Sequence, residues 1–366
     1  FIDLVDRSGR IQLQARLDVL GEERMEQLLS LVDLGDLIGV DGTVFASRRG
    51  ELTLRIDDYA VLAKALRPPP DKHAGLQDVE TKFRHRELDL MSSEESRELF
   101  VTRARIIAEL RRYLDDHGFI EVETPILQPL YGGAAARPFT THHNELGRDL
   151  YLRIATELYL KRLIVGGLER VYEIGKNFRN EGVSHKHNPE FTAVEWYEAY
   201  ADYEDVMTRV EALMPRLAAA AGYEGEIDWS TLRRISFVDS IREATGIDVM
   251  ALDAAGLAAA MGVEVEAWPQ LCDALFSKSV EPTLIQPTFV IDYPKALSPF
   301  AKDKPGAPGV VERFEAFAGG VEFANAFTEL NDPDEQRERF EAQVRYAEEG
   351  DDEAQPYDEV FVEALE

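Results

Sequence analysis

The stretch FRNEGVSHKHNPEFTAVEWYEAYADY, residues Phe178–Tyr203, carries the strongest signal in the chain. It opens with a charged turn, Arg179–Gly182, and a polar loop leads from there into a run that predicts a strand. Alternate side chains of a strand share one face, so an aromatic ring, a carboxylate and a phenol are expected side by side. With an arginine and a glutamate beside the glycine turn, the pattern favours a binding site over an ordinary sheet with scattered charges. The residues expected on one face are Phe191, Ala193, Glu195 and Tyr197.

The composition is that of a globular protein with a strong acidic excess. A chain of 366 residues is long enough for two domains, each with its own core. The 40 basic and 69 acidic residues give a net charge of −29, which argues against a general electrostatic binder of nucleic acid and indicates no DNA partner. A local basic stripe can still bind RNA on an acidic protein.

Cysteine content and hydropathy bear on the compartment. Cys272 is the only cysteine and lies in an apolar run, so we expect it to fill core in a reducing, cytoplasmic compartment. No apolar run is long enough to span a bilayer, so no membrane partner is expected. The sequence starts at Phe1, inside a strand pattern and without an initiator methionine, and we interpret it as part of a longer protein.

Residues 1–66 alternate apolar and polar positions between turn signals, a pattern typical of short strands. Glu22–Leu31 predicts one helix across the middle. Several short strands with one inserted helix fit a small barrel of the OB type that lacks its first strand, and a generic small β-domain is the alternative. Pro68–Pro70 ends this region, and a linker is expected over residues 67–91. The predicted strands are Phe1–Val5, Arg10–Ala15, Leu37–Ala46 and Glu51–Ile56.

Residues 92–125 predict a helix followed by a strand. Ser92 and Glu95 have the spacing of a capping box, and Gly118 is expected to stop the helix. The strand Phe119–Pro125 follows and ends in proline. The helix carries one apolar stripe, made of Phe100, Ala104, Ile107, Leu110 and Leu114.

A hairpin is predicted over Phe314–Leu330, with Gly319-Gly320 as its turn. This turn pairs Phe317 with Glu322, so Glu315 and Glu322 are expected to share a face. Two carboxylates that meet without a basic partner suggest a divalent cation bound through oxygen, the usual arrangement for Mg²⁺ beside phosphates.

These features resemble class II aminoacyl-tRNA synthetases, and more narrowly the bacterial-type lysyl-tRNA synthetases, along essentially the whole chain. Phe178–Tyr203 is similar to motif 2 of that family, and the helix–strand unit before it to motif 1. The resemblance implies an α+β fold, with an N-terminal OB-fold β-barrel over residues 1–66. It implies a catalytic domain over 92–366, built on an antiparallel sheet flanked by helices, with a largely helical insertion at about 204–287. A homodimer formed through motif 1 around Pro125 is implied as well.

The resemblance implies an ATP site built around Arg179. That residue would bind the α-phosphate of ATP and the substrate carboxylate, a task that suits a planar, permanently charged fork, and it is the candidate catalytic residue. Glu181 would accept from the adenine amino group, and Phe191 would stack on adenine. Glu315 and Glu322 would bind both ATP and Mg²⁺. The remaining ATP-binding residues, at the phosphates and the loop, are His187 and Asn188.

The same resemblance implies a lysine site in which Glu157 and Glu329 surround the side-chain ammonium and Glu195 takes the α-amino group. A substrate without the ammonium would leave buried acids unpaired, a penalty of about 2–5 kcal/mol. Glu329 and Glu322 have opposite parity along one strand, so a bulge is expected at 323–324. The other implied lysine-binding residues are Gly133, Arg179, Tyr197, Asn325 and Phe327.

Three N-terminal residues resemble the anticodon-reading positions of the subgroup for lysine, aspartate and asparagine. Phe1 is an aromatic ring on which a base can stack, and Gln12 and Glu51 offer groups for base edges. Splayed single-stranded bases are the usual way in which RNA sequence is read. The resemblance implies the central anticodon uridine as the target.

Taken together, the resemblance implies ATP-dependent activation of L-lysine to lysyl-adenylate and transfer of the lysyl group to tRNA(Lys). Gly350–Ala354 and Tyr357–Glu359 match the family just before motif 3, but the glycine-rich strand and arginine of motif 3 do not follow. Two alternatives stay open: a lysine ligase that modifies a protein, which residues 1–66 disfavour, and a synthetase-like RNA-binding protein. An aspartate or asparagine enzyme is disfavoured, because Glu157 and Glu329 would repel an acidic side chain.

Overall fold

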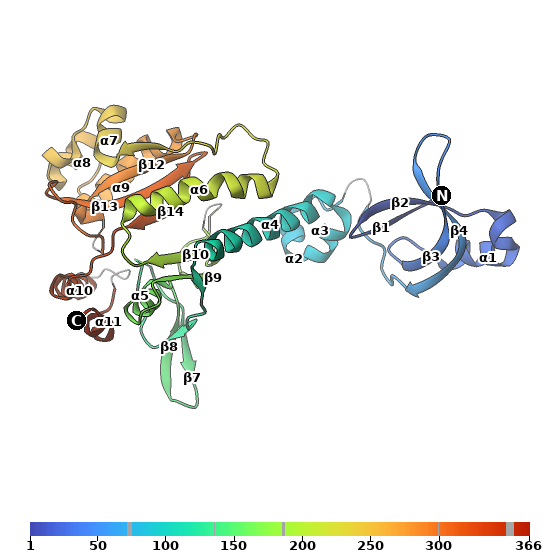
Figure 1. Ribbon diagram of the computed structural model, residues 1–366, viewed down its shortest axis with the longest axis horizontal. Coiled ribbons are helices and arrows are strands. Elements are labelled where there is room, and N and C mark those ends of the chain that lie inside the picture. The colour runs from blue at the N-terminus through green and yellow to red at the C-terminus, as the bar shows by residue number, and fades with distance from the viewer. Residues whose placement is uncertain (72–74, 135, 185–186, 299, 349–354) are drawn as a thin grey trace. The chain divides into compact units, whose positions relative to one another are not determined.

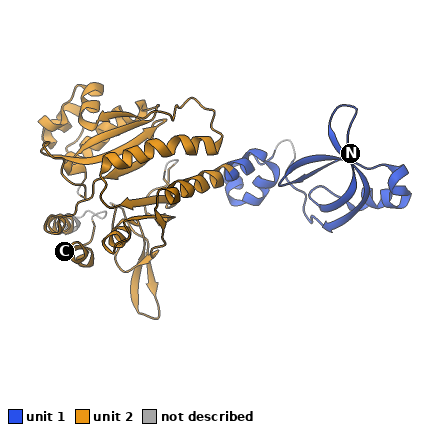
Figure 2. Cartoon of the chain, in the orientation of Figure 1, with its two compact units in different colours: residues 1–101 blue, residues 102–366 orange. Residues whose placement is uncertain are grey.

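The computed structural model describes the chain except for residues 72–74, 135, 185–186, 299 and 349–354. Its residues form two compact units, 1–101 and 102–366, which are described one at a time (Figure 2). Gly350–Ala354, which matches the family before motif 3, lies outside the described residues, as does His185 in the polar loop that follows Gly182.

Unit 1 contains a four-stranded sheet in the order β1-β2-β4-β3 (Figure 1). β1 pairs antiparallel with β2, and β3 with β4, whereas β2 and β4 run parallel. Leu20 and Leu28 of helix α1 pack in one core with Leu13, Ile56 and Tyr59 of the sheet. The elements are β1 (Ile2–Asp6), β2 (Gly9–Gln14), α1 (Leu17–Leu31), β3 (Leu37–Ala46), β4 (Leu52–Ala63), α2 (Val79–Arg84), α3 (Arg86–Ser92) and the start of α4 (Glu94–Asp116).

The four predicted strands of this unit are found, with two corrections to element bounds. β4 continues to Ala63 and not only to Ile56, because its second half pairs with the first half of β3. Helix α1 begins at Leu17 and not at Glu22, since Gly21, with a φ of 75°, joins two helical pieces at a kink. Glycine adopts this left-handed angle without the steric cost of a side chain.

The capping box predicted at Ser92 is wrong. Ser92 ends helix α3, and its hydroxyl donates to the carbonyl of Leu88 at 2.8 Å. Helix α4 is capped by Ser93, whose Oγ accepts from the backbone N–H of Ser96 at 3.1 Å. The short helix α3 has too few residues for an apolar period to show in the sequence, so the serine at its end has the pattern of a helix start.

Unit 2 has three sheets among its described residues, in the orders β10-β9-β5, β6-β8-β7 and β11-β12-β13-β14 (Figure 1). Strand pairs are antiparallel except for β5 with β9 and β11 with β12. The strands are β5 (Ile120–Glu121), β6 (Leu127–Gln128), β7 (Thr140–His143), β8 (Arg148–Leu152), β9 (Arg170–Phe178), β10 (Glu190–Glu198), β11 (Arg233–Ser236), β12 (Thr288–Pro294), β13 (Val310–Ala318) and β14 (Val321–Phe327).

Helices surround these sheets and share their cores. Phe237 and Phe276 from two of the helices stack at 4.8 Å between ring centroids and pack with Tyr293 and Phe317 of the largest sheet. Cys272 is fully buried in the same core, as predicted. Mainly antiparallel sheets with separate helices confirm the predicted α+β class. The helices are α5 (Glu157–Val165), α6 (Tyr203–Ala221), α7 (Phe237–Thr245), α8 (Ala254–Met261), α9 (Trp268–Ser279), α10 (Pro333–Glu348) and α11 (Glu359–Leu365), with single 3₁₀ turns at Val249–Ala251, Glu281–Thr283 and Lys295–Leu297.

The strand predicted over Phe119–Pro125 is shorter than expected. Only Ile120 and Glu121 pair with β9, as strand β5. The backbone N–H of Thr124 donates to the side chain of Glu173 at 3.0 Å and not to a strand neighbour, because the chain turns away from the sheet before the proline.

The predicted hairpin and its bulge are both confirmed. Phe317 pairs with Glu322 across the Gly319-Gly320 turn, but the next pair is Ala316 with Ala324, which leaves Phe323 as the extra residue of a bulge. The bulge shifts the face of every later residue of β14, so that residues on either side of it can serve one site. No helix in the described part of the chain combines the length and apolarity that crossing a bilayer requires.

Candidate active site

A cavity of about 1310 Å³ in unit 2 is lined by α5, β10, β14 and the loop before β7. It contains all eight residues predicted for lysine. It does not contain the other predicted ATP and metal residues, Glu181, His187, Asn188, Phe191, Glu315 and Glu322. The eight that line it are Gly133, Glu157, Arg179, Glu195, Tyr197, Asn325, Phe327 and Glu329.

A buried ion cluster lies between α5 and the end of β14. Lys161 Nζ lies 2.6 Å from Glu157 Oε1, one helical turn earlier, and also contacts Glu329 Oε2. The same ammonium lies 5.5 Å from the ring centroid of Phe327 and 5.9 Å from that of Phe361. The two acids predicted to receive an ammonium from the substrate therefore already share one from the protein. Lys161 was missed from the sequence, although its i,i+4 spacing from Glu157 pointed to it.

The electrostatics of this cluster depend on burial and on its mixed charges. Burial alone would lower the pKa of Lys161, but Glu157 and Glu329 outweigh it and raise that pKa above the ordinary value. Burial raises the pKa of Glu329 to about 8, with Lys161 opposing the rise and Glu157 adding to it. The pKa of Tyr197 is raised well above its usual value, because its hydroxyl is buried among carboxylates.

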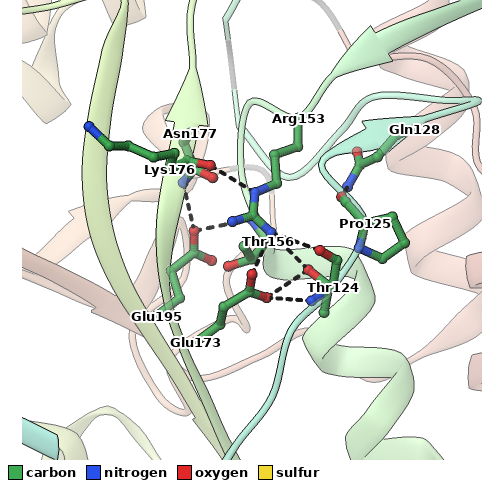
Figure 3. A network of polar contacts seen from close by, with 9 residues as sticks. All are labelled: Thr124, Pro125, Gln128, Arg153, Thr156, Glu173, Lys176, Asn177 and Glu195. Atoms are coloured by element: carbon green, nitrogen blue, oxygen red, sulfur yellow. Dashed lines mark hydrogen bonds and ion pairs between the residues drawn. The ribbon is translucent and has the colours of Figure 1, made fainter.

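Glu195 is fixed by hydrogen bonds at the start of α5. Its Oε1 accepts from the backbone N–H of Thr156 at 3.2 Å and from Asn177 Nδ2 at 3.4 Å (Figure 3). The hydroxyl of Tyr197 donates to Oε2 at 3.3 Å. Burial, and to a lesser degree the charge of Glu157, raise the pKa of Glu195. Asn177 was not predicted; it lies opposite Phe191 in the β9–β10 register, one pair from the loop.

Gly133 lies directly against Glu157 with a φ of +88°. A Cβ at this position would lie 2.9 Å from the Cβ of Glu157 and 3.2 Å from that of Ala155. Its backbone N–H donates to Gln355 Oε1 at 3.0 Å. Both the backbone angle and the close approach require glycine here, and the loop is thereby held over the acidic end of the cavity.

Arg179 presents its guanidinium at the edge of the cavity. The guanidinium carbon lies 5.2 Å from the ring centroid of Phe191, and Nε donates to the carbonyl of Ile154 at a long 3.4 Å. Within the described residues its two Nη groups make no hydrogen bond, so they remain available to an anion. Nearby, Ser184 Oγ lies 2.9 Å from His187 Nδ1.

Glu315 and Glu322 differ from the prediction in one respect. Glu315 has a basic partner, because Arg313 forms an ion pair with it. The hydroxyl of Tyr293 also donates to Glu315, at 2.8 Å. Glu322 is still reached by solvent, yet the surrounding protein and then the charge of Glu315 raise its pKa to about 7. Arg313 was missed, although its position two residues before Glu315 on β13 puts both side chains on one face.

A second buried network supports the strand that carries Glu195 (Figure 3). Arg153 is 1% exposed; its Nε donates to the carbonyl of Lys176 at 2.9 Å, its Nη1 donates to Thr124 Oγ1 at 3.2 Å, and it forms an ion pair with Glu173. Glu173 also accepts from the hydroxyl of Thr124 at 2.7 Å. Arg153, which directly follows β8, is thus joined to β9 and to the loop before Pro125.

Two of the predicted anticodon residues of unit 1 lie side by side. Gln12 Nε2 donates to Glu51 Oε2 at 3.3 Å, and Gln12 Oε1 accepts from the hydroxyl of Thr53 at 3.2 Å. Phe1 is 79% exposed. The arrangement offers amide and carboxylate groups to a base edge and an uncovered ring for stacking.

Two family models match separate parts of the chain. The family described as tRNA synthetases class II (D, K and N) matches residues 78–366, and the OB-fold nucleic acid binding domain matches residues 1–62. The second match confirms the OB-fold predicted for the N-terminal region.

Curated relatives match the whole chain. A protein of Chloroflexus aurantiacus named lysine--tRNA ligase is 52% identical over 380 residues, covering 100% of this chain and 77% of the relative. Proteins of the same name from Staphylococcus haemolyticus and Bacillus subtilis are 49% and 51% identical, with 77% and 76% of the relative covered.

Proposed function

The chain belongs to the lysine–tRNA ligases, within the class II tRNA synthetases for aspartate, lysine and asparagine, and on this premise we propose how its cavity acts. The enzyme activates lysine with ATP and joins the lysyl group to tRNA. The observation that carries our assignment of the site is the cavity itself. Among the charged side chains that line it are Glu157, Glu195 and Glu329 at the end near α5, and Arg179.

The charges of the cavity match those of lysine. We assign the α-amino group to Glu195, the side-chain ammonium to Glu157 and Glu329, and the carboxylate to Arg179. A neutral side chain of similar length would leave a buried carboxylate unpaired, at a cost of about 2–5 kcal/mol. The ring of Phe327 lines the cavity beside these acids and suits the methylene stem of the substrate.

Activation needs no nucleophile from the protein. The lysine carboxylate attacks the α-phosphorus of ATP in line, and the bond to the β-phosphate oxygen breaks to release pyrophosphate. A ribose hydroxyl of the tRNA then attacks the lysyl carbonyl, and AMP leaves. Arg179 holds the carboxylate and the α-phosphate together and neutralises developing charge, so catalysis consists of positioning and electrostatic stabilisation. Phe191, beneath the guanidinium, is assigned to adenine, and Glu181, His187 and Asn188 to the remainder of ATP.

Mg²⁺ fits the pair Glu315 and Glu322. Burial and the neighbouring Glu315 raise the pKa of Glu322 to about 7. A bound divalent cation would offset the repulsion between the two carboxylates. A cation bound by one or two carboxylates plus phosphates is the usual arrangement for Mg²⁺. When bound, Mg²⁺ would neutralise charge on the phosphates, while the ion pair with Arg313 would hold the Glu315 carboxylate in place.

The proposal is tested by lysine-dependent exchange of pyrophosphate into ATP, using the protein at its full natural length and each amino acid in turn. Exchange with lysine alone is expected. If lysine supports none but the protein binds tRNA, the RNA-binding alternative replaces the enzyme. If exchange occurs but the lysyl group reaches a protein and not tRNA, the protein-modifying ligase is correct. The OB-fold match over residues 1–62 argues against that last outcome.

We expect lysine binding to tighten as pH rises from 6 towards 8. The raised pKa of Glu329, about 8, leaves the carboxyl largely protonated below that pH. The substrate ammonium favours the ionised form, so binding releases a proton, and the KM for lysine falls by up to about tenfold per pH unit until it levels off. The KM for ATP, measured in the same exchange assays, serves as the internal control. A lysine KM that is flat over this range contradicts the assignment of Glu329.

Unit 1 binds the anticodon in our proposal, through Phe1, Gln12 and Glu51. Replacing Phe1 with alanine removes a stacking surface worth about 1–3 kcal/mol, so we expect the Kd for tRNA(Lys) to rise by about 5- to 150-fold. Filter binding at fixed salt measures this. Leu29→Ala, at a side chain that is 77% exposed on α1, is the matched control and should leave the Kd unchanged. Equal Kd values for both variants would place the tRNA elsewhere.

The remaining assignments follow from the family. We propose a homodimer through the loop around Pro125, where the apolar side chains of Ile120, Ile126 and Leu127 are 49%, 43% and 49% exposed.

We also propose a cytoplasmic location, as a role in translation requires. Finally, we propose the anticodon domain over 1–66, a hinge over 67–91 and the catalytic domain over 92–366 with a helical insertion at about 204–287.

A further inference from the structure

The ion cluster at the end of the cavity contains a protein cation, Lys161, which acids do not need in order to bind the ammonium of a lysine substrate. Glu157 and Glu329 carry two negative charges when ionised, and Lys161 removes one of them. The cluster then has a net charge of −1, which one substrate ammonium neutralises. Two acids without Lys161 would be left at −1 after the same ammonium had bound.

We propose that Lys161 is a positioning residue for the substrate side chain: it holds Glu157 and Glu329 together and leaves them a single negative charge for one incoming ammonium. Lys161 acts through the two carboxylates and need not touch lysine itself. The inference rests on the function proposed above and deepens it, because it assigns the charge selectivity of the site to a residue outside the eight predicted ones.

The geometry keeps Lys161 in place. Lys161 is 9% exposed, and its ammonium contacts both carboxylates. Two aromatic rings lie within 6 Å of that ammonium: Phe327, which lines the cavity, and Phe361, which belongs to α11. Glu329, by contrast, keeps 33% of its side chain exposed. The protein cation is thus enclosed, while one of the acids it pairs with remains open to a ligand.

A purely structural ion pair explains the surroundings less well. The charged and titratable groups facing Glu329 are Glu157 and Lys161 from α5 and Glu195 and Tyr197 from β10. Three acids that share a single protein cation are a poor way to stabilise a fold, since desolvating buried charges offsets their attraction. The two carboxylates in excess are accounted for by the two ammonium groups of the substrate, one assigned to Glu195 and the other to Glu157 and Glu329.

The decisive experiment compares the pH profile of the lysine KM for the full-length wild-type enzyme, Lys161→Met and Lys161→Arg in pyrophosphate exchange. An opposite charge at this distance shifts a carboxyl pKa by about 1–3 units. The pH above which the lysine KM stops falling should therefore be higher in Lys161→Met than in the wild type, by at least about one unit. At pH 7 this raises the KM by about tenfold or more, while the KM for ATP changes less than about twofold. Lys161→Arg keeps the charge and should keep the wild-type levelling pH.

Each outcome has one reading. A Lys161→Met profile that matches the wild type, or tighter lysine binding by this variant, overturns the inference. If that variant fails to fold, judged by circular dichroism, Lys161→Arg decides alone: a levelling pH shifted upward despite the retained charge overturns it. Lys278→Met, at an exposed lysine of α9, is the matched control. Absence of lysine-dependent exchange in the wild type defeats the proposed function instead, so the two failures are distinguishable.

Discussion

Replacing Arg179 with alanine is expected to slow lysine-dependent pyrophosphate exchange by about 10³-fold or more. An arginine that stabilises a transferring phosphoryl group is worth about 10³–10⁵ in rate, and this one is also assigned to the substrate carboxylate. Its Nε makes only a long hydrogen bond, of 3.4 Å, to the protein. The side chain therefore contributes little to its own loop, and its loss should leave the fold intact. Exchange kinetics at saturating lysine and ATP measure the effect.

The charge-preserving variant separates electrostatics from geometry. Arg179→Lys keeps the positive charge but loses the planar fork that binds a carboxylate and a phosphate at once, so a rate between those of the wild type and the alanine variant is expected. Arg148→Ala, at an exposed arginine of β8, is the matched control and should exchange at the wild-type rate. Less than a tenfold loss in Arg179→Ala would mean that another cation holds the α-phosphate.

The parts of the site that were predictable lie on regular strands. Alternation along β10 predicts that Glu195 and Tyr197 share a face, and the hydroxyl of Tyr197 does donate to Glu195 at 3.3 Å, because side-chain direction in a strand follows directly from sequence position. The same reasoning predicted the bulge beside Glu322, since the carboxylates before and after it have opposite parity. The assignment of chemistry to these residues needed the family resemblance as well, because alternation shows only that side chains share a face.

The parts that were missed are cations, and one of their contacts is tertiary. Lys161 contacts Glu329, which lies 168 residues later in the chain. No local sequence pattern predicts such a pairing. Arg313 lies two residues before Glu315 on β13, so strand alternation already puts both side chains on one face. Both Lys161 and Arg313 are cations that neutralise predicted acids. A list of the carboxylates alone therefore overstates the free negative charge of a site, because a cation from the same element or from another can pair with them.

Arg153 gives the largest expected effect on stability. It is enclosed with Glu173, at 2% and 5% side-chain exposure, and removing one partner of such a buried pair leaves an uncompensated charge. We expect Arg153→Met to lower the free energy of unfolding by about 3–5 kcal/mol. The three tryptophans of the chain, Trp196, Trp229 and Trp268, all lie in unit 2. Tryptophan fluorescence in urea therefore follows the unfolding of the unit that contains the pair.

The double variant Arg153→Met/Glu173→Met tests whether the loss comes from the stranded charge. If it does, the double variant should be more stable than Arg153→Met alone, because no buried charge remains. Recovery should be partial, since Thr124 loses the carboxylate that accepts from its backbone N–H and its hydroxyl. The exposed pair Arg111 and Glu121, at 43% and 39% exposure, is the control, and Arg111→Met should cost no more than about 1 kcal/mol. A double variant no more stable than Arg153→Met would show that the hydrogen bonds of Arg153 to the carbonyls of Lys176 and Thr124, and not its charge pairing, hold the three segments together.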